Sequence, residues 1–179
     1  MEGDDVVRWY ALRDLKRPNA KVKAYQLLEE QGFEVFTPLH WVVTTVAGKK
    51  QRRKVPVISD MLFVRSTRSM LDKVVAATDT LQYRVDQGMQ ATPMTVRDEE
   101  MDIFARACGA VPEVRYYLPE EITPDMIGKP IRIIGGTLDG LEGVLLKTRG
   151  TRKKRLLVQL PGLLAAAIEV APTLIHPIC

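Results

Sequence analysis

The feature that most constrains the fold is a short segment, residues 112–128, that is rich in proline and acidic residues. Pro112, Pro119, Pro124 and Gly128 fall within it, together with four acidic side chains and one basic side chain. Such a composition favours an extended connector over a packed helix or strand. A chain of 179 residues has the length of one to two domains. We therefore predict a domain at residues 1–111, a flexible linker at 112–127 and a smaller domain at 128–179.

Charge and cysteine usage indicate where the protein works. The net charge of +4 is uneven, because residues 1–111 carry +2, the acidic connector −3 and residues 129–179 +5. Two cysteines, Cys108 and Cys179, are too few for a disulfide framework, and free thiols fit a reducing compartment. The first five residues are acidic where a signal peptide would be basic, and no apolar run reaches 18 residues. We expect a cytoplasmic protein with no membrane segment.

The first 110 residues alternate between β-rich runs and helical patterns. A helix is expected where Val22, Tyr25 and Leu28 recur at three-residue steps before Gly32. The expected elements are a strand at 6–15, a helix at 20–31, a β-rich run at 33–46 with a bend or an edge position at Pro38, an exposed basic hairpin tip at 47–54, a strand at 55–64, a helix capped by Ser69, a strand at 83–85 and a helix capped by Thr95. This order predicts an α+β domain, in which a mixed or antiparallel four-stranded sheet is flanked by about three helices.

The last 50 residues read as short strands separated by glycine turns. The expected strands are 131–134, 143–146, 155–160, 167–170 and 174–178. Strands this short and closely spaced predict a small β-barrel. Residues 163–168 (LLAAAI) also have strong helix propensity, so a helical alternative for this segment stays open.

The inventory of reactive side chains argues against an enzyme. His40 and His176, the two histidines, lie in separate apolar runs and read as structural imidazoles. The glycines between residues 135 and 143 match no phosphate-binding loop, and the acidic residues near 98–102 suit a helix N-terminus better than paired-carboxylate catalysis. We expect no catalytic residue, no metal site and no cofactor.

Three sequence blocks together resemble the NusG family. They are Arg8-Trp9-Tyr10-Ala11-Leu12, the run GKKQRRKVPVISDMLFVR at 48–65, and IRIIGGTLDGLEGVLLKT at 131–148. The first two are similar to the NusG N-terminal domain and the third to the KOW motif, which implies an SH3-like barrel. The resemblance implies a transcription elongation factor that binds the clamp helices of the large subunit of RNA polymerase and suppresses pausing or termination.

The resemblance also implies where polymerase would bind. The family's hydrophobic pocket corresponds here to Trp9 and Tyr10 in the first strand and to Ile58 and Met61 in the third. Aromatic and flexible apolar side chains at such a surface give a large contact area to a partner helix. Adjacent strand residues point to opposite faces, however, so Trp9 or Tyr10 should belong to the core. For Ile58 and Met61, packing and contact are equally open.

Two clusters of cations are candidates for nucleic-acid contact. The first, Lys49, Lys50, Arg52, Arg53 and Lys54, can track phosphates of nontemplate DNA or nascent RNA weakly, and its alternative is a solvated loop. The second is a basic turn in the KOW domain formed by Arg149, Arg152, Lys153, Lys154 and Arg155. For this turn, RNA contact and simple solubility are both open.

Two departures from the family pattern favour a specialised paralogue. Ser59-Asp60-Met61 replaces a common Pro-Gly-Tyr, and Pro161-Gly162-Leu163 replaces the Phe-Gly-Arg by which the KOW domain binds Rho or a ribosomal protein. Binding of either partner is therefore doubtful. The chain is more similar to RfaH and to the UpxY factors of surface-polysaccharide operons, which act as operon-specific antiterminators. The alternative is a free-standing RNA-binding or ribosome-associated KOW protein.

Overall fold

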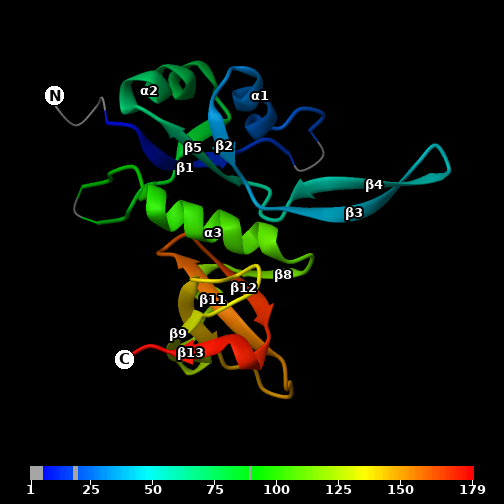
Figure 1. The fold of residues 1–179 in the computed structure, drawn as a ribbon. Coiled ribbons are helices and arrows are strands. Elements are labelled where there is room, and N and C mark those ends of the chain that lie inside the picture. Colours follow the sequence, from blue (N-terminus) through cyan, green and yellow to red (C-terminus); the bar gives the residue numbers. More distant parts are fainter. Residues whose placement is uncertain (1–5, 18–19, 89) are drawn as a thin grey trace. The chain divides into compact units, whose positions relative to one another are not determined.

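The computed structural model describes residues 6–17, 20–88 and 90–179 (Figure 1). The chain divides into two compact units, Met1–Asp98 and Glu99–Cys179. The third helix, expected in the first domain, is grouped with the second unit. We describe each unit by itself, and the predicted domain limits stay a prediction.

The first unit is built on an antiparallel sheet. Its strands are β1 (Arg8–Asp14), β2 (Glu34–Phe36), β5 (Met61–Ser66), β6 (Leu81–Tyr83) and β7 (Thr95–Val96). They are ordered β2-β5-β1-β6, and β7 adds a further pairing to β1, which makes five strands where four were expected. Helices α1 (Ala24–Glu30) and α2 (Arg68–Ala77) lie on one side of this sheet (Figure 1). The expected α+β architecture is confirmed.

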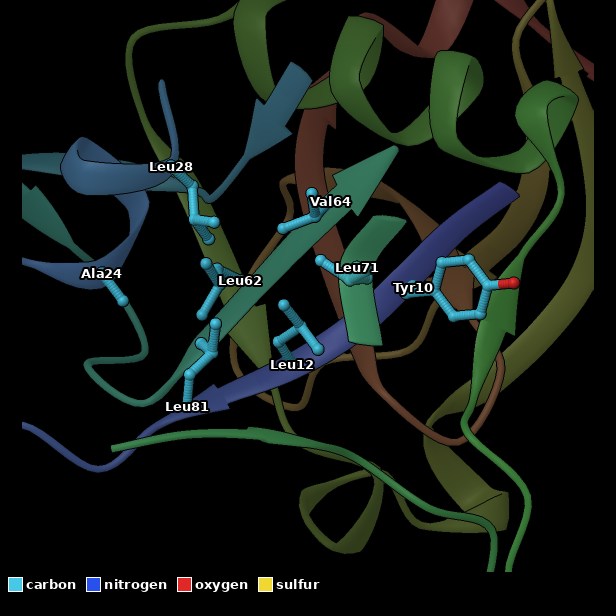
Figure 2. Close-up of a cluster of buried hydrophobic side chains, with 8 residues drawn as sticks. All are labelled: Tyr10, Leu12, Ala24, Leu28, Leu62, Val64, Leu71 and Leu81. Carbon is cyan, nitrogen blue, oxygen red and sulfur yellow. The ribbon is translucent and has the colours of Figure 1, made fainter. Parts of the chain in front are cut away.

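The main core of this unit lies between the sheet and the two helices. Tyr10 and Leu12 of β1 pair with Val64 and Leu62 of β5, so these four side chains share one face. Figure 2 shows this cluster of buried side chains, which consists of Tyr10, Leu12, Ala24, Leu28, Leu62, Val64, Leu71 and Leu81. The alternation of β1 places Trp9 and Ala11 on the opposite face of the sheet, where both are also buried.

Several element ends differ from the sequence expectation. The expected strand at 55–64 is interrupted by a turn, because the amide of Met61 donates to the carbonyl of Ile58 at 3.2 Å, and β5 begins only at Met61. Helix α2 is capped by Thr67, whose side chain accepts a hydrogen bond from the Met70 amide, and not by Ser69. Thr95 belongs to strand β7 and caps no helix; α3 (Asp98–Ala110) begins three residues later.

A separate two-stranded ribbon extends from the first unit. It consists of β3 (Leu39–Val46) and β4 (Lys49–Pro56), joined by a turn at Ala47 and Gly48, whose φ angles are 49° and 77°. The bend expected at Pro38 is confirmed, since β2 ends before it and β3 begins after it. The expected basic tip at 47–54 is corrected: the tip is only two residues long, and the basic residues follow it along β4.

The second unit contains a six-stranded antiparallel sheet. Its strands are β8 (Val114–Tyr117), β9 (Ile127–Ile133), β10 (Glu142–Leu146), β11 (Lys154–Leu160), β12 (Leu164–Val170) and β13 (Ile175–Pro177). Their order is β13-β9-β10-β11-β12-β8. The five strands expected from the sequence are present, so the small β domain is confirmed. The expected barrel is not closed, because the terminal strands β13 and β8 do not pair with each other in the described sheet.

Strand β8 lies within the segment that the sequence predicts as the linker. It pairs with β12 through registers that include Val114 with Ile168 and Tyr117 with Ala165. The edge of β12 offers unpaired backbone groups, and Val114, Tyr116 and Tyr117 have high strand propensity. The helix-prone segment at 163–168 contributes to β12, where its small side chains are buried.

Candidate functional site

Strand β4 presents its cations on two faces of the β3–β4 ribbon. Lys54 pairs with Trp41, Arg52 with Val43 and Lys50 with Thr45, so these six residues share a face, which we call the Trp41 face. Lys49 and Arg53 pair with Val46 and Val42 on the opposite face. All five cations are exposed, and none of them forms an ion pair with another residue that the structure describes.

Trp41 is the centre of this face. Its side chain is 57% exposed, and Val43 beside it is 64% exposed. The guanidinium carbon of Arg52 lies 4.9 Å from the centroid of the Trp41 ring, and the ammonium of Lys54 lies 5.2 Å from it. Both cations lie over the ring within cation–π distance, and more than half of the Trp41 side chain is still exposed.

This arrangement suits a single-stranded nucleic acid. An exposed indole offers a surface on which a base can stack, and flanking cations can pair with the phosphates on either side. Sequence reasoning identified the cations and missed Trp41. The signal was present in the two-residue turn, because pairing Val46 with Lys49 places Trp41 opposite Lys54.

The four residues predicted to bind polymerase occupy different environments. Trp9, Tyr10 and Met61 are 6%, 5% and 3% exposed, and Ile58 is half-buried in the turn before β5. Tyr10 lies in the core cluster, with its ring edge-on to Tyr83 at a centroid distance of 5.9 Å. Trp9 and Met61 lie on the opposite face of the sheet, so the four side chains do not form one surface.

Asp60, in the turn next to Ile58, links three segments of the first unit. Its carboxylate lies 3.5 Å from Arg13 Nε and 3.2 Å from an Arg84 guanidinium nitrogen. The carbonyl of Asp60 also accepts a hydrogen bond from the Asp14 amide at 3.1 Å. Asp60 therefore fixes the turn that presents Ile58.

The five cations of the basic turn in the second unit differ in solvent exposure. Arg149, Arg152, Lys153 and Lys154 are exposed, whereas Arg155 is buried at the start of β11. Lys153 forms an ion pair with Glu169 of β12, with 2.9 Å between Nζ and Oε2.

Residues that could bind metals or act as acids and bases are dispersed. Within residues 6–17, 20–88 and 90–179, no group of three His, Cys, Asp or Glu side chains could hold a metal ion. His40 and His176, expected in apolar surroundings, are both exposed on strands. Burial raises the pKa of the Cys108 thiol to about 11.

In the same described segments, no helix is both long enough and apolar enough to cross a membrane.

Comparisons with known proteins identify the first unit. A family model described as "Transcription termination factor nusG" matches residues 7–105, more than half of the chain. A solved structure described as "Domain interaction in Thermotoga maritima NusG" aligns with 18% identity and a TM-score of 0.47, covering 97% of this chain and 98% of that chain. No curated protein matches. On the strength of the match over residues 7–105, the chain belongs to the NusG family of transcription elongation and termination factors, whose members bind RNA polymerase.

Proposed function

We propose that this protein binds RNA polymerase during elongation, suppresses pausing or termination, and uses the Trp41 face to hold a single strand of nucleic acid. Members of its family are transcription factors and not enzymes. The observation that carries the nucleic-acid part is the exposed indole of Trp41 with Arg52 and Lys54 beside it. The strand bound would be nontemplate DNA or nascent RNA, and the binding would be weak and sensitive to salt.

The polymerase contact that we propose centres on Ile58. This side chain is half-buried in a turn held by Asp60, so it can contact a partner without leaving the core. The family's partner is the clamp helices of the large subunit. Met61 begins β5 directly after this turn and supports it, whereas Trp9 lies opposite Arg65 toward the other end of the β1–β5 pair. Tyr10 belongs to the helix-covered core, and we assign it a structural role.

The full chain should be tested for retention of purified core RNA polymerase. Ile58→Glu should abolish retention without unfolding the chain, because a buried contact would have to accommodate a charge. Met70→Glu is the matched control, since Met70 is 55% exposed on α2 and makes no part of the proposed contact. Equal retention by both folded variants would reject the proposed contact.

The direction of the effect should be measured by single-round transcription through a pause site and a terminator. We expect the wild-type chain to increase read-through. Retention on polymerase with no change in pausing or termination would reject this function. Binding of RNA without any retention on polymerase would favour the alternative, a free-standing or ribosome-associated RNA-binding protein.

We also propose an operon-specific role as an antiterminator, with surface-polysaccharide operons as the model. Support comes from the residues that depart from the general factor, Ser59-Asp60-Met61 and Pro161-Gly162-Leu163. A factor of this kind acts in the cytoplasm, and its KOW domain would not bind Rho or the ribosomal protein. Read-through on templates with and without the leader of the operon nearest its own gene tests this. Equal read-through on all templates would indicate a general factor.

A further inference from the structure

The second unit contains a basic groove of about 1010 Å³. Residues from the loop before β11, from β8 and from the end of β12 line it. Six cations contribute, namely Arg115, Arg149, Arg152, Lys153, Lys154 and Arg155. Two carboxylates, Glu113 and Glu169, also line it. The lining therefore has a positive excess of four charges, which attracts anions.

Arg155 gives this groove a fixed charge. Its side chain is only 7% exposed, and it makes no hydrogen bond or ion pair with any residue that the structure describes. Its register partner on β12 is Glu169, whose carboxylate is bonded to Lys153 at 2.9 Å. A charge removed from water is costly unless a partner compensates it. An anion in the groove would supply that partner.

A second polar group in the same lining is also unsatisfied. The hydroxyl oxygen of Thr148 is buried and has no hydrogen-bond partner among the described residues. A hydroxyl can donate to an anionic oxygen, and a buried polar group without a partner destabilises the folded chain. Arg155 and Thr148 thus both lack a partner that an oxygen-rich anion could provide.

The lining also indicates which kind of anion. No aromatic side chain is among the lining residues, so the groove offers no surface for base stacking. Arginine pairs with phosphate through two parallel hydrogen bonds. The six lining cations suit a chain of repeated phosphates, whereas an isolated acidic side chain would use one or two of them.

We propose that this groove binds the phosphodiester backbone of a single-stranded nucleic acid, independently of its sequence, with Arg155 and Arg115 contacting phosphate oxygens. The site is separate from the Trp41 face and does not depend on binding to polymerase. It recruits Arg115 from the segment that the sequence predicts as a linker, beyond the basic turn itself.

The test is fluorescence anisotropy with a labelled 12-residue oligouridylate and its DNA equivalent, titrated with the full chain carrying Trp41→Ala to reduce binding at the ribbon. Arg115→Gln and Arg155→Gln should each weaken binding about 3- to 10-fold and lower the salt slope by about 0.7, the value for one phosphate contact on a single strand. The tighter of the two oligomers identifies the natural strand. Lys129→Gln is the matched control, since Lys129 is an exposed cation of β9 outside the lining.

Arg115 is exposed, so its substitution leaves the proposal testable even if Arg155→Gln unfolds the second unit. The proposal would be overturned if folded Arg115→Gln bound both oligomers as tightly as Lys129→Gln. It would also be overturned if a hexaglutamate peptide bound in an Arg115-dependent manner while neither oligomer did, because the ligand would then be an acidic protein segment.

Discussion

The guanidinium carbon of Arg52 lies 4.9 Å from the centroid of the Trp41 ring. Arg52 is not the direct register partner of Trp41, which is Lys54; it reaches the ring diagonally from the position opposite Val43. Two cations therefore lie over the indole, which is still 57% exposed. This geometry turns a run of basic residues into an ordered surface with a place for a base.

Replacing Trp41 with alanine should weaken binding of a single-stranded oligonucleotide. Loss of one stacked base costs about 1–3 kcal/mol, which corresponds to at least about a 5-fold increase in Kd. Trp41→Phe keeps an aromatic ring and should retain part of the affinity. Fluorescence anisotropy measures all three Kd values. Equal affinities would show that only the charges of the ribbon contribute.

The two faces of the ribbon should contribute unequally. Arg52→Gln with Lys54→Gln removes two charges from the Trp41 face, whereas Lys49→Gln with Arg53→Gln removes two from the opposite face. Both pairs change the net charge by the same amount, so binding that depends on net charge alone predicts equal losses of affinity. We expect the first pair to lose more affinity at every salt concentration. Matching losses would argue against a defined binding face.

Much of the fold could be predicted because local signals agree with the tertiary structure. Gly32 was expected to end the first helix, and it has a φ of 86° two residues after Glu30, the last residue of α1. Pro38 separates β2 from β3 as expected. The predictions failed where alternatives were locally equivalent. Both Thr67 and Ser69 can cap a helix, and the turn containing Ile58 and Asp60 is fixed by distant partners.

The candidate site was harder to predict, because it depends on register and burial. The cations of β4 stand out in the sequence, but their distribution between two faces follows from the turn at Ala47 and Gly48. Nothing in the basic turn of the second unit marks Arg155 as buried. Arg115 lies 40 residues earlier in the chain and joins the same groove only because β8 pairs with β12.

A small network around Asp72 should make the first unit sensitive to acid. Asp72 accepts hydrogen bonds from Arg68 at 2.6 Å and from the Tyr83 hydroxyl at 2.8 Å. Desolvation opposes ionisation, but these hydrogen bonds and the Arg68 charge outweigh it and hold the pKa of Asp72 below its ordinary value of 3.8. The resulting stabilisation is complete above pH 3.8 and is lost as the pH falls through the lowered pKa.

Asp72→Asn should therefore lower the free energy of unfolding at pH 7 and have little effect at pH 2. The side chain is 47% exposed, so solvent screening limits the loss at pH 7 to less than about 1 kcal/mol. Urea unfolding at both pH values measures the difference. Asp79→Asn is the control, because Asp79 is exposed and has no ion pair with a described residue. A loss that is equal at both pH values would argue against a role for the charge.

The two cysteines should differ in reactivity. Burial raises the pKa of Cys108 to about 11, so little thiolate forms at pH 8, whereas Cys179 is exposed. We expect iodoacetamide to modify Cys179 first and Cys108 only after unfolding. Mass spectrometry of peptides after timed labelling gives both rates. Early labelling of Cys108 in the folded chain would contradict its placement on α3 against Tyr116 of β8.

Gly143 should be essential for the packing of β10 against β11. A Cβ at this position would lie 2.4 Å from the Leu157 carbonyl oxygen, a backbone atom that cannot move without displacing the strand. Gly143→Ala should therefore destabilise the second unit by about 1–3 kcal/mol. Gly109→Ala is the matched control, because Gly109 lies in α3 with open space around it, and alanine there should stabilise the helix by up to about 1 kcal/mol.

Two probes can assign the loss to the correct unit. Trp9 and Trp41 are the only tryptophans and both lie in the first unit, so tryptophan fluorescence follows that unit, whereas far-UV circular dichroism follows both. Gly143→Ala should shift the dichroism transition to lower urea while changing the fluorescence transition less. If Gly143→Ala left both transitions unchanged, the result would contradict the close approach of the β10 and β11 backbones at Gly143.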